Sequence, residues 1–366
     1  MLLLASKGTQ QWLVSLICQD PAQASGACHR SLQLLHLLER DGWQLQPIGP
    51  GQTPPGRLTT VRHGLTAALR HGPLQPLGID SLRSQGHTSQ SVAHLYSRFP
   101  NLSGVLLEGT GYGSLTAVAE WRLRGVRTVL VPANIESLAP NIGSWTHRGR
   151  DVAQRFADER RWWAMADAIF TISIEEAWWL QLHGIHAEVL PYYPAPKRQH
   201  ELEDIRMGRT PDPAVGYLWL ADFRNPANIA GVHELLTFLQ QAGLPPCLIL
   251  AVGHGSDQLQ KTIPSSLVHS FSFRGPVTDA ELGELQKRCV AQLIVHPPTS
   301  GRLTRVVDSA LAGIPVIGNT MALKSDQHLF QDNDLISNTW PSCPHVIAQP
   351  MPSEAAESVF LAALES

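Results

Sequence analysis

Cysteine is sparse in this 366-residue chain, and its spacing excludes the common small metal sites. The five cysteines lie far apart and form no CxxC pair: Cys18, Cys28, Cys247, Cys289 and Cys343. Histidine is more frequent, with 16 residues, but no His-Cys-Asp cluster has the spacing of metal ligands. We therefore expect no bound metal. An odd number of cysteines also favours a reduced cytoplasmic protein over a disulfide scaffold.

Long apolar runs and a strong excess of either charge are also lacking. The longest apolar runs, WLVSLI and CLILAV, have the length of strands, well short of the roughly 20 residues of a membrane span. The first residues, MLLLASKGTQQ, lack the basic leader of a signal peptide. The formal net charge of -3 argues against a broad electrostatic grip on nucleic acid or on an anionic membrane. We expect a soluble cytoplasmic protein with no nucleic-acid partner and at most peripheral membrane contact.

What the chain does contain is a repeated alternation of strand and helix patterns. The expected strands are Trp12–Cys18, Trp43–Ile48, Gly104–Leu107, Val126–Val131, Ala168–Ile172, Ala187–Leu190, Val215–Leu220, Pro246–Val252, Ser270–Phe273, Ala291–Val295 and Pro315–Ile317. The expected helices are Ser31–Arg40, Thr116–Arg124, Val152–Ala164, Ile229–Ala242, Asp279–Lys287, Leu303–Leu311 and Glu354–Leu364. Such alternation implies βαβ units and mostly parallel sheets, so the fold class is α/β.

One stretch interrupts the alternation, and the length of the chain also suggests two domains. Residues 194–213, PAPKRQHELEDIRMGRTPDP, are rich in charge and proline and show no apolar periodicity, with one helical turn expected around Glu201–Arg206. We predict an N-terminal acceptor-binding Rossmann-like lobe (1–195), a linker (196–213), a C-terminal donor lobe (214–345) and a final helix (346–366) that packs back across the lobes. The carboxyl ends of strands from both sheets would converge on an interlobe cleft.

Two other features have competing interpretations. GTGYGS (Gly109–Ser114) follows a strand and could approach a phosphate, but it lacks the GxGxxG order and the P-loop lysine, so a strand-to-helix turn is favoured. A dinucleotide oxidoreductase would need GxGxxG after a strand and an acidic residue about 20 positions later. The sequence contains no such pattern. The pairs Trp162-Trp163 and Trp178-Trp179 could bind a lipid-linked acceptor or a membrane, and packing in the core or between lobes is favoured.

The most informative segment is Pro297–Asn319, PPTSGRLTRVVDSALAGIPVIGN. Its loop, Ser300–Arg302, precedes a helix, and a helix N-terminus offers free N–H groups and a positive dipole end to an anion. Arg305 in the first turn adds a fixed charge suited to a diphosphate. Asp308 could accept a hydrogen bond from a ribose or sugar hydroxyl. The alternative is a surface helix with an i,i+3 Arg–Asp pair worth a few tenths of a kcal/mol.

This segment resembles the donor site of glycosyltransferase family 4, where a loop glycine and a basic residue precede an acidic residue and "AxAxGxPVV". Five other stretches resemble the family in the right order: SGACHRSL (Ser25–Leu32), VPANIESL (Val131–Leu138), ERRWWAMADAIFTIS (Glu159–Ser173), LWLADFRNPANIAGVHELL (Leu218–Leu236) and FRGPVTDAELGELQKRC (Phe273–Cys289). The resemblance covers most of the chain. It implies a GT-B fold and glycosyl transfer from a nucleoside diphosphate sugar to a hydroxyl acceptor, with retention at the anomeric carbon.

The resemblance also implies roles for matched positions. Arg224, Arg305 and Asp308 would carry the chemistry, the two arginines on the departing diphosphate and Asp308 on the ribose. The acceptor, a glycan, lipid-linked or small molecule, would lie against Gly26, Asn134 and Glu136. The remaining residues expected to bind the donor are Arg274, Gly275, Ser300, Gly301, Arg302, Leu303 and Thr304.

Three positions depart from the family pattern. The usual pair of glutamates eight positions apart is replaced by Ser300 and Asp308, so the carboxylate that holds the donor sugar is absent. Ala133 stands where one branch has histidine, and a single glycine, Gly26, stands where two are common. Ser300 and Ala133 favour the alternative function, a catalytically degenerate GT-B protein that binds nucleotide or acts as a scaffold.

Overall fold

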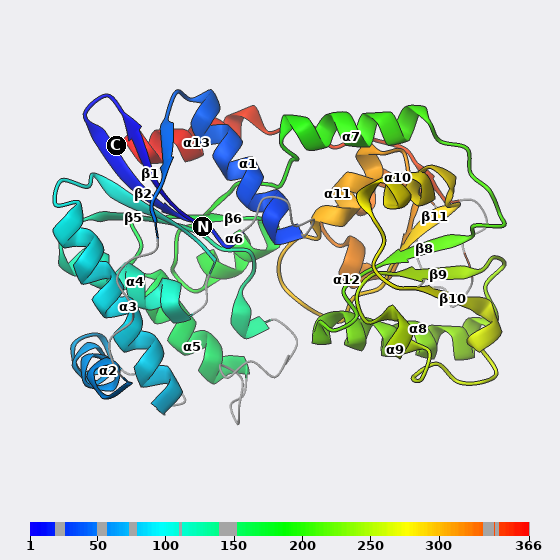
Figure 1. Cartoon of the computed structure of the whole chain (residues 1–366), viewed down its shortest axis with the longest axis horizontal. Helices are drawn as coiled ribbons and strands as arrows, with labels where there is room; N and C mark the ends of the chain where they lie inside the picture. The colour runs from blue at the N-terminus through cyan, green and yellow to red at the C-terminus, as the bar shows by residue number, and fades with distance from the viewer. Residues whose placement is uncertain are drawn as a thin grey trace.

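Figure 1 shows two α/β lobes set side by side. The structure is a computed structural model of the chain, and it describes residues 1–18, 26–49, 57–72, 79–109, 112–138, 152–331, 340 and 344–365. Each lobe is built on one main sheet, of seven strands in the N-terminal lobe and five in the C-terminal lobe. The predicted α/β class, with two Rossmann-like lobes, is confirmed.

The N-terminal sheet has the order β3-β1-β2-β4-β5-β6-β7. Its strands are β1 (Leu2–Lys7), β2 (Gln10–Ser15), β3 (Gln44–Pro47), β4 (Gly104–Glu108), β5 (Arg127–Val131), β6 (Ala168–Thr171) and β7 (Glu188–Val189). Pairing is parallel from β2 to β7, whereas β1 runs antiparallel to both of its neighbours, β2 and β3. The sequence interpretation missed β1, since it evaluated the opening residues only as a leader.

Helices cover both faces of this sheet. The N-terminal lobe contains α1 (Gly26–Arg40), α2 (Arg57–His71), α3 (Ile79–Arg98), α4 (Tyr112–Leu123), η1 (Glu136–Leu138), α5 (Val152–Trp163), α6 (Ile174–Leu182) and, from the end of the chain, α13 (Glu354–Glu365). One core joins α1 and α13 to one face, and a second core joins α3, α4 and α5 to the other. Because side chains alternate along a strand, Leu106 enters the first core while Val105 and Leu107 enter the second.

Helices α2 and α3, which the sequence did not predict, form a closely packed pair. A Cβ added at Gly64 would lie 1.8 Å from the Leu82 carbonyl oxygen, and one at Gly86 would lie 1.9 Å from that of Thr60. Only glycine permits this approach of two backbones. The buried Glu120 of α4 accepts hydrogen bonds from Ser89 of α3 and Arg124 and lies 3.1 Å from His71 of α2.

The C-terminal sheet is wholly parallel in the order β10-β9-β8-β11-β12. Its strands are β8 (Tyr217–Leu220), β9 (Ile249–Val252), β10 (Phe271–Arg274), β11 (Ala291–Ile294) and β12 (Val316–Gly318). The other elements are α8 (Pro226–Ala242), α9 (Ser256–Leu259), η3 (Val268–Ser270), α10 (Asp279–Arg288), α11 (Thr304–Leu311), α12 (Thr320–Leu323), η4 (Gln327–Leu329) and the pair β13 (Phe330–Gln331) and β14 (His345–Val346). The strand order reverses between β8 and β11, which is where open α/β sheets bind ligands.

The expected linker is largely helical, which corrects the prediction of a single helical turn. Helix α7 spans Pro196–Met207, and its Leu202 and Ile205 are buried in a core with Leu218 and Leu250 of the C-terminal sheet. Two apolar side chains three positions apart are enough to pack one face of a charged helix against the protein. Two residues are too few to give a recognisable apolar periodicity in the sequence. The domain boundaries themselves remain predictions.

Two further expectations need correction. A disulfide joins Cys18 to Cys28 in the first turn of α1, with Cα atoms 4.7 Å apart, so the expectation of reduced cysteines is wrong for this pair. A spacing of ten residues gave no sign of this pairing. Trp162 and Trp163 are buried as favoured, but Trp178 is 59% exposed.

Gly109 follows β4 with a positive φ and α4 begins at Tyr112, consistent with a strand-to-helix turn, while residues 110 and 111 lie outside the described part. Within the described ranges, no helix combines the length and apolarity that crossing a bilayer requires.

Candidate functional site

The two lobes touch where the loop before α11 meets the loop after β5. The Ile135 amide donates to Ser300 Oγ at 2.7 Å, and Ser300 Oγ donates back to the Ile135 carbonyl at 3.0 Å. Gly301 has a φ of +81°, and a Cβ there would lie 2.9 Å from the Ala133 carbonyl oxygen. Glycine is therefore required both by the backbone and by the approach of the other lobe. The expected donor loop and the expected acceptor segment are in direct contact.

Beneath this contact lies a buried carboxylate that the sequence interpretation did not single out. Glu176, in the first turn of α6, accepts a hydrogen bond from the Ile135 amide at 2.9 Å. Burial raises the pKa of Glu176 to about 7, against the opposing effect of its hydrogen bonds with Ser300 and Ile135. The signal that could have found it is the sequence Ser-Ile-Glu-Glu, because Ser173 caps α6 and accepts from the Glu176 amide.

A second connection between the same elements lies beside it. Ser325 donates to both carboxylate oxygens of Glu175 at 3.1 Å, linking the segment after α12 to α6. Lys324 donates to the Thr299 carbonyl, and burial lowers its pKa while Glu176 and Glu175 oppose the shift. The lobe contact is therefore polar and partly charged.

Asp308 binds the other lobe and the segment that joins the lobes. Its Oδ1 accepts from the Tyr192 hydroxyl at 2.9 Å, and its Oδ2 accepts from Arg198 Nε at 3.1 Å. His29 Nδ1 of α1 lies 3.4 Å from the same Oδ2. Desolvation opposes ionisation, but His29, Arg198 and Tyr192 hold the pKa of Asp308 below its usual value. Both carboxylate oxygens are engaged by protein groups, and its role toward a ribose remains a prediction.

Arg305 lies at the point where the strand order of the C-terminal sheet reverses. It is the second residue of α11, whose first residue follows Leu303, an N-cap that provides no side-chain hydrogen bond. Its Nη1 donates to the carbonyl of Leu220, the last residue of β8, at 3.2 Å, and its buried Nε has no partner. Burial lowers the pKa of Arg305 to about 10, and burial, together with the charge of Arg305, lowers the pKa of His296 to about 4.

Arg302 already forms hydrogen bonds and an ion pair within the protein. Its guanidinium pairs with Asp326 through Nε at 2.9 Å, and Nη1 donates to the Tyr192 carbonyl at 3.3 Å. Leu303 and Thr304 complete the turn into α11. Of the two arginines beside the α11 N-terminus, only Arg305 has a buried nitrogen without a hydrogen bond.

The other expected donor residues, Arg224, Arg274 and Gly275, lie at or after the carboxyl ends of other strands of the sheet. Arg224 follows β8, pairs with Asp222 at 2.8 Å and is 62% exposed. Arg274 ends β10, the outermost strand, which β9 and β8 separate from β11, and Gly275 follows it. The Arg274 carbonyl accepts from Ser256 Oγ at 2.8 Å. These residues belong to the same edge of the sheet as Arg305 because the strands are parallel.

The expected acceptor residues fall on two elements. Gly26 is the first residue of α1, the helix that carries His29, and Asn134 lies against Gly301. Glu136 begins η1, where burial raises its pKa. The Glu136 amide donates to Glu159 of α5 at 3.0 Å, and burial raises the pKa of Glu159 to about 7. Among the described residues no group of three or more His, Cys, Asp or Glu is placed to hold a metal ion. Metal-independent binding stays a prediction.

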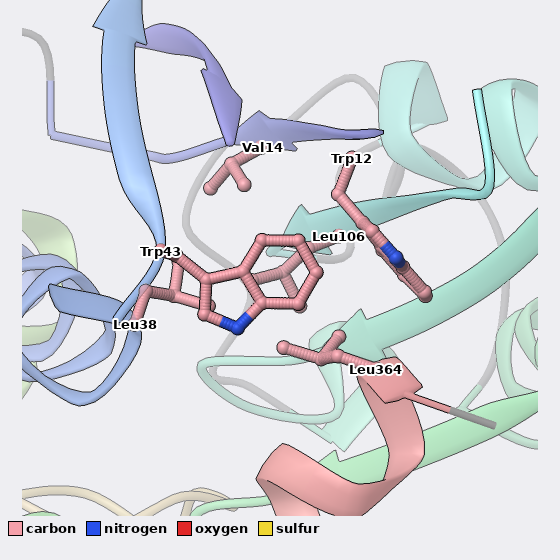
Figure 2. A pocket seen from close by; sticks show the side chains of 6 residues that line it. All are labelled: Trp12, Val14, Leu38, Trp43, Leu106 and Leu364. Atoms are coloured by element: carbon pink, nitrogen blue, oxygen red, sulfur yellow. The ribbon is translucent and has the colours of Figure 1, made fainter. Parts of the chain in front are cut away.

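Two cavities lie elsewhere in the N-terminal lobe. Figure 2 shows the first, a narrow gap lined by Trp12, Val14, Leu38, Trp43, Leu106 and Leu364. All six belong to the core between the sheet, α1 and α13, and the gap is too narrow for a water molecule. The second, of about 480 Å³, lies at the amino-terminal edge of the same sheet, near Arg127 and Asp167. Neither is at the lobe contact.

Comparisons with known proteins find structural similarity but assign the chain to no family. No family model and no curated protein matches the sequence. The UDP-GlcNAc 2-epimerase of Methanocaldococcus jannaschii superposes with 12% identity and a TM-score of 0.44, covering 79% of this chain and 83% of that one. Anabaena Alr3699/HepE in complex with UDP has 15% identity and a TM-score of 0.47, covering 86% and 88%. Acinetobacter baumannii MurG has 12% identity and a TM-score of 0.38, covering 78% and 71%. Likeness of this size assigns no activity.

Proposed function

We propose that this protein binds a nucleoside diphosphate sugar at the N-terminus of α11 and transfers its sugar to a hydroxyl acceptor. The observation that carries the proposal is Arg305: a buried guanidinium with an unpartnered Nε, placed beside a helix start that has no side-chain cap. A buried cation without a counter-charge is costly, and an arriving diphosphate would supply the missing partner. The sequence resemblance to family 4 supports the same position.

The chemistry proposed for this site is electrostatic. As the bond from the sugar to the diphosphate breaks, negative charge accumulates on the leaving phosphate. Arg305 and the first amides of α11 would stabilise that charge in a site largely shielded from water, where charges interact more strongly. Arg224 is exposed and pairs with Asp222, and its remaining N–H donors would contact the other phosphate. The resemblance implies retention, with the acceptor deprotonated late by the leaving phosphate.

The acceptor would approach from the N-terminal lobe. The 133–136 segment already touches the donor loop through Ser300 and Gly301, so Asn134 and Glu136 stand next to the position proposed for the sugar. Glu136 is a half-buried carboxyl whose pKa is raised by burial, and it would orient an acceptor hydroxyl. Gly26 would lie at the other side, at the start of α1.

The test is calorimetric titration of UDP, GDP and ADP into the wild type and into Arg305→Met, with and without EDTA. Removing a charged hydrogen bond of about 1.5–3 kcal/mol should weaken binding by roughly 10- to 150-fold, independently of EDTA. Arg288→Met, at an exposed arginine of the same lobe paired with Asp212, is the matched control and should bind normally. Wild-type affinity in folded Arg305→Met would remove the diphosphate from this helix.

A second function, nucleotide binding without transfer, is favoured by one observation. Ser300 stands where the family holds the donor sugar, and its hydroxyl both accepts from and donates to Ile135. A side chain so engaged is poorly placed to bind sugar hydroxyls. Incubating the protein with nucleotide sugars and measuring release of nucleotide separates the two functions, since a binding module would release none.

A further inference from the structure

Helix α2 presents its leucines to solvent and its small residues to the protein. Leu58, Leu65 and Leu69 are 88%, 48% and 89% exposed. At 100° per residue these three positions lie within one narrow stripe along the helix. The buried positions include Thr60, Ala67 and Ala68. A surface helix of a globular protein normally has the opposite arrangement, so the leucine stripe calls for a partner outside the chain.

The orientation of α2 is fixed by its contacts. Gly64 and Gly86 seat the helix against α3 at a distance that no other residue would allow, and His71 at its end lies 3.1 Å from the buried Glu120. Rotating the leucines inward would replace these glycine contacts by clashes of larger side chains with backbone. Figure 1 shows α2 at the outer end of the N-terminal lobe, beyond α3. The stripe is therefore a permanent outer surface.

The charges on α2 indicate which kind of partner would bind this surface. The helix, RLTTVRHGLTAALRH, contains three arginines and two histidines and no acidic residue, although the chain as a whole has a net charge of -3. Arg62 is exposed within the leucine stripe, and its guanidinium has no hydrogen bond or ion pair within the described residues. A second copy of the chain packed symmetrically on this face would bring like charges together. An apolar surface covered by negative charge suits the helix better.

We propose that α2 is a membrane-docking helix that lies in the plane of a lipid bilayer with anionic headgroups. The 15-residue helix would lie along the bilayer for about 22 Å. Leu58, Leu65 and Leu69 enter the boundary between headgroups and acyl chains, and Arg62 contacts the anionic headgroups, while Arg70 lies 3.6 Å from the buried Glu120. This assignment is independent of the donor site proposed above.

The experiment is sedimentation of the full-length protein with large vesicles of phosphatidylcholine alone or with about one third phosphatidylglycerol. We expect at least about tenfold stronger partition onto the anionic vesicles, reduced at high salt because surface charges are screened. The double variant Leu58→Ser/Leu69→Ser and the variant Arg62→Glu should each lose at least about tenfold. Leu244→Ser, at a 52% exposed leucine of the C-terminal lobe, is the matched control and should partition normally.

Three results would overturn the assignment. Equal and weak partition onto both kinds of vesicle would remove the lipid surface as partner. The same loss in Leu244→Ser would show a non-specific apolar effect. A concentration-dependent dimer on gel filtration, abolished by Leu58→Ser/Leu69→Ser and accompanied by no vesicle binding, would assign the stripe to a second copy. Thermal unfolding of each variant establishes that its fold is intact.

Discussion

Glu176 is the residue at the lobe contact whose ionisation should depend most on pH in the neutral range. Its pKa is about 7 in the folded protein against an ordinary value near 4.5, so the folded state retains its proton to higher pH. Stability from this group is fully present below pH 4.5 and is lost as pH rises through 7. A shift of this size corresponds to at most roughly 3 kcal/mol.

We therefore expect Glu176→Gln, which keeps the shape and cannot ionise, to lose less stability than the wild type between pH 5 and pH 8. Urea unfolding at both pH values measures this difference. Glu203→Gln, at an exposed glutamate of α7, should behave as the wild type does. An identical pH dependence in Glu176→Gln and the wild type would show that Glu176 is ionised throughout and that its pKa is not raised.

The sequence singled out Ser300, Arg305 and Asp308 near α11, but it did not predict which protein groups they contact. Spacing within 297–319 placed Ser300 and Asp308 eight positions apart, and the structure adds partners that are distant in the chain. Ile135 is separated from Ser300 by 165 residues, and Tyr192 from Asp308 by 116. Local patterns carry no information about contacts at such separations, which the relative placement of two sheets decides.

Among the elements, the α2–α3 pair depends most directly on single positions. Gly86→Ala would place a methyl group 1.9 Å from the Thr60 carbonyl oxygen, so the helices must separate. We expect a loss of at least about 2 kcal/mol in the free energy of unfolding, comparable to overpacking of a core. Gly283→Ala, inside α10 with open space around it, is the matched control and should stabilise by about 0.5–1 kcal/mol.

Chemical denaturation of the two variants measures this contrast. A Gly86→Ala variant as stable as Gly283→Ala would mean that α2 and α3 are not packed backbone to backbone. The same experiment bears on the leucine stripe, because a displaced α2 could no longer hold its leucines outward.

Most elements were predictable from sequence because their apolar patterns are strong. All strands of the two main sheets except β1, and the helices α8, α10 and α11, were found within a few residues of their bounds. Helices α2 and α3 were missed because the residues they bury include Thr60, Gly64 and Gly86, which carry no apolar periodicity. Helix α7 was underestimated for a related reason, since charge dominates its sequence.

At the scale of the whole molecule, Asp308 connects three elements: its own helix α11, α1 through His29 and α7 through Arg198. Asp308→Asn keeps the shape and removes the charge that Arg198 and His29 face. Breaking a buried ion pair costs about 3–5 kcal/mol, so we expect a clear loss in the free energy of unfolding. We also expect a larger radius of gyration, because the lobes would be held together less tightly. Denaturation and the radius of gyration from small-angle X-ray scattering measure the two effects.

Asp222→Asn, which removes an exposed partner of Arg224, is the control and should change stability by at most about 1 kcal/mol. The family resemblance implies a different outcome for Asp308. If this carboxylate bound a ribose, the wild type would prefer UDP to 2′-deoxy-UDP, and Asp308→Asn would lose that preference while keeping its stability and its scattering profile. That combination would contradict a structural role.

The path of the chain constrains how the lobes can move. It leaves the N-terminal lobe after Leu190 to enter α7, which packs on the C-terminal sheet, and it returns after β14 to α13, which packs on the N-terminal sheet. Two bodies tied together at two points turn most readily about the line through those points, so opening has one dominant hinge axis. Tyr192 lies within the first crossing and therefore close to this axis. Its hydrogen bond to Asp308 would change little during a rotation that carries Ser300 away from Ile135.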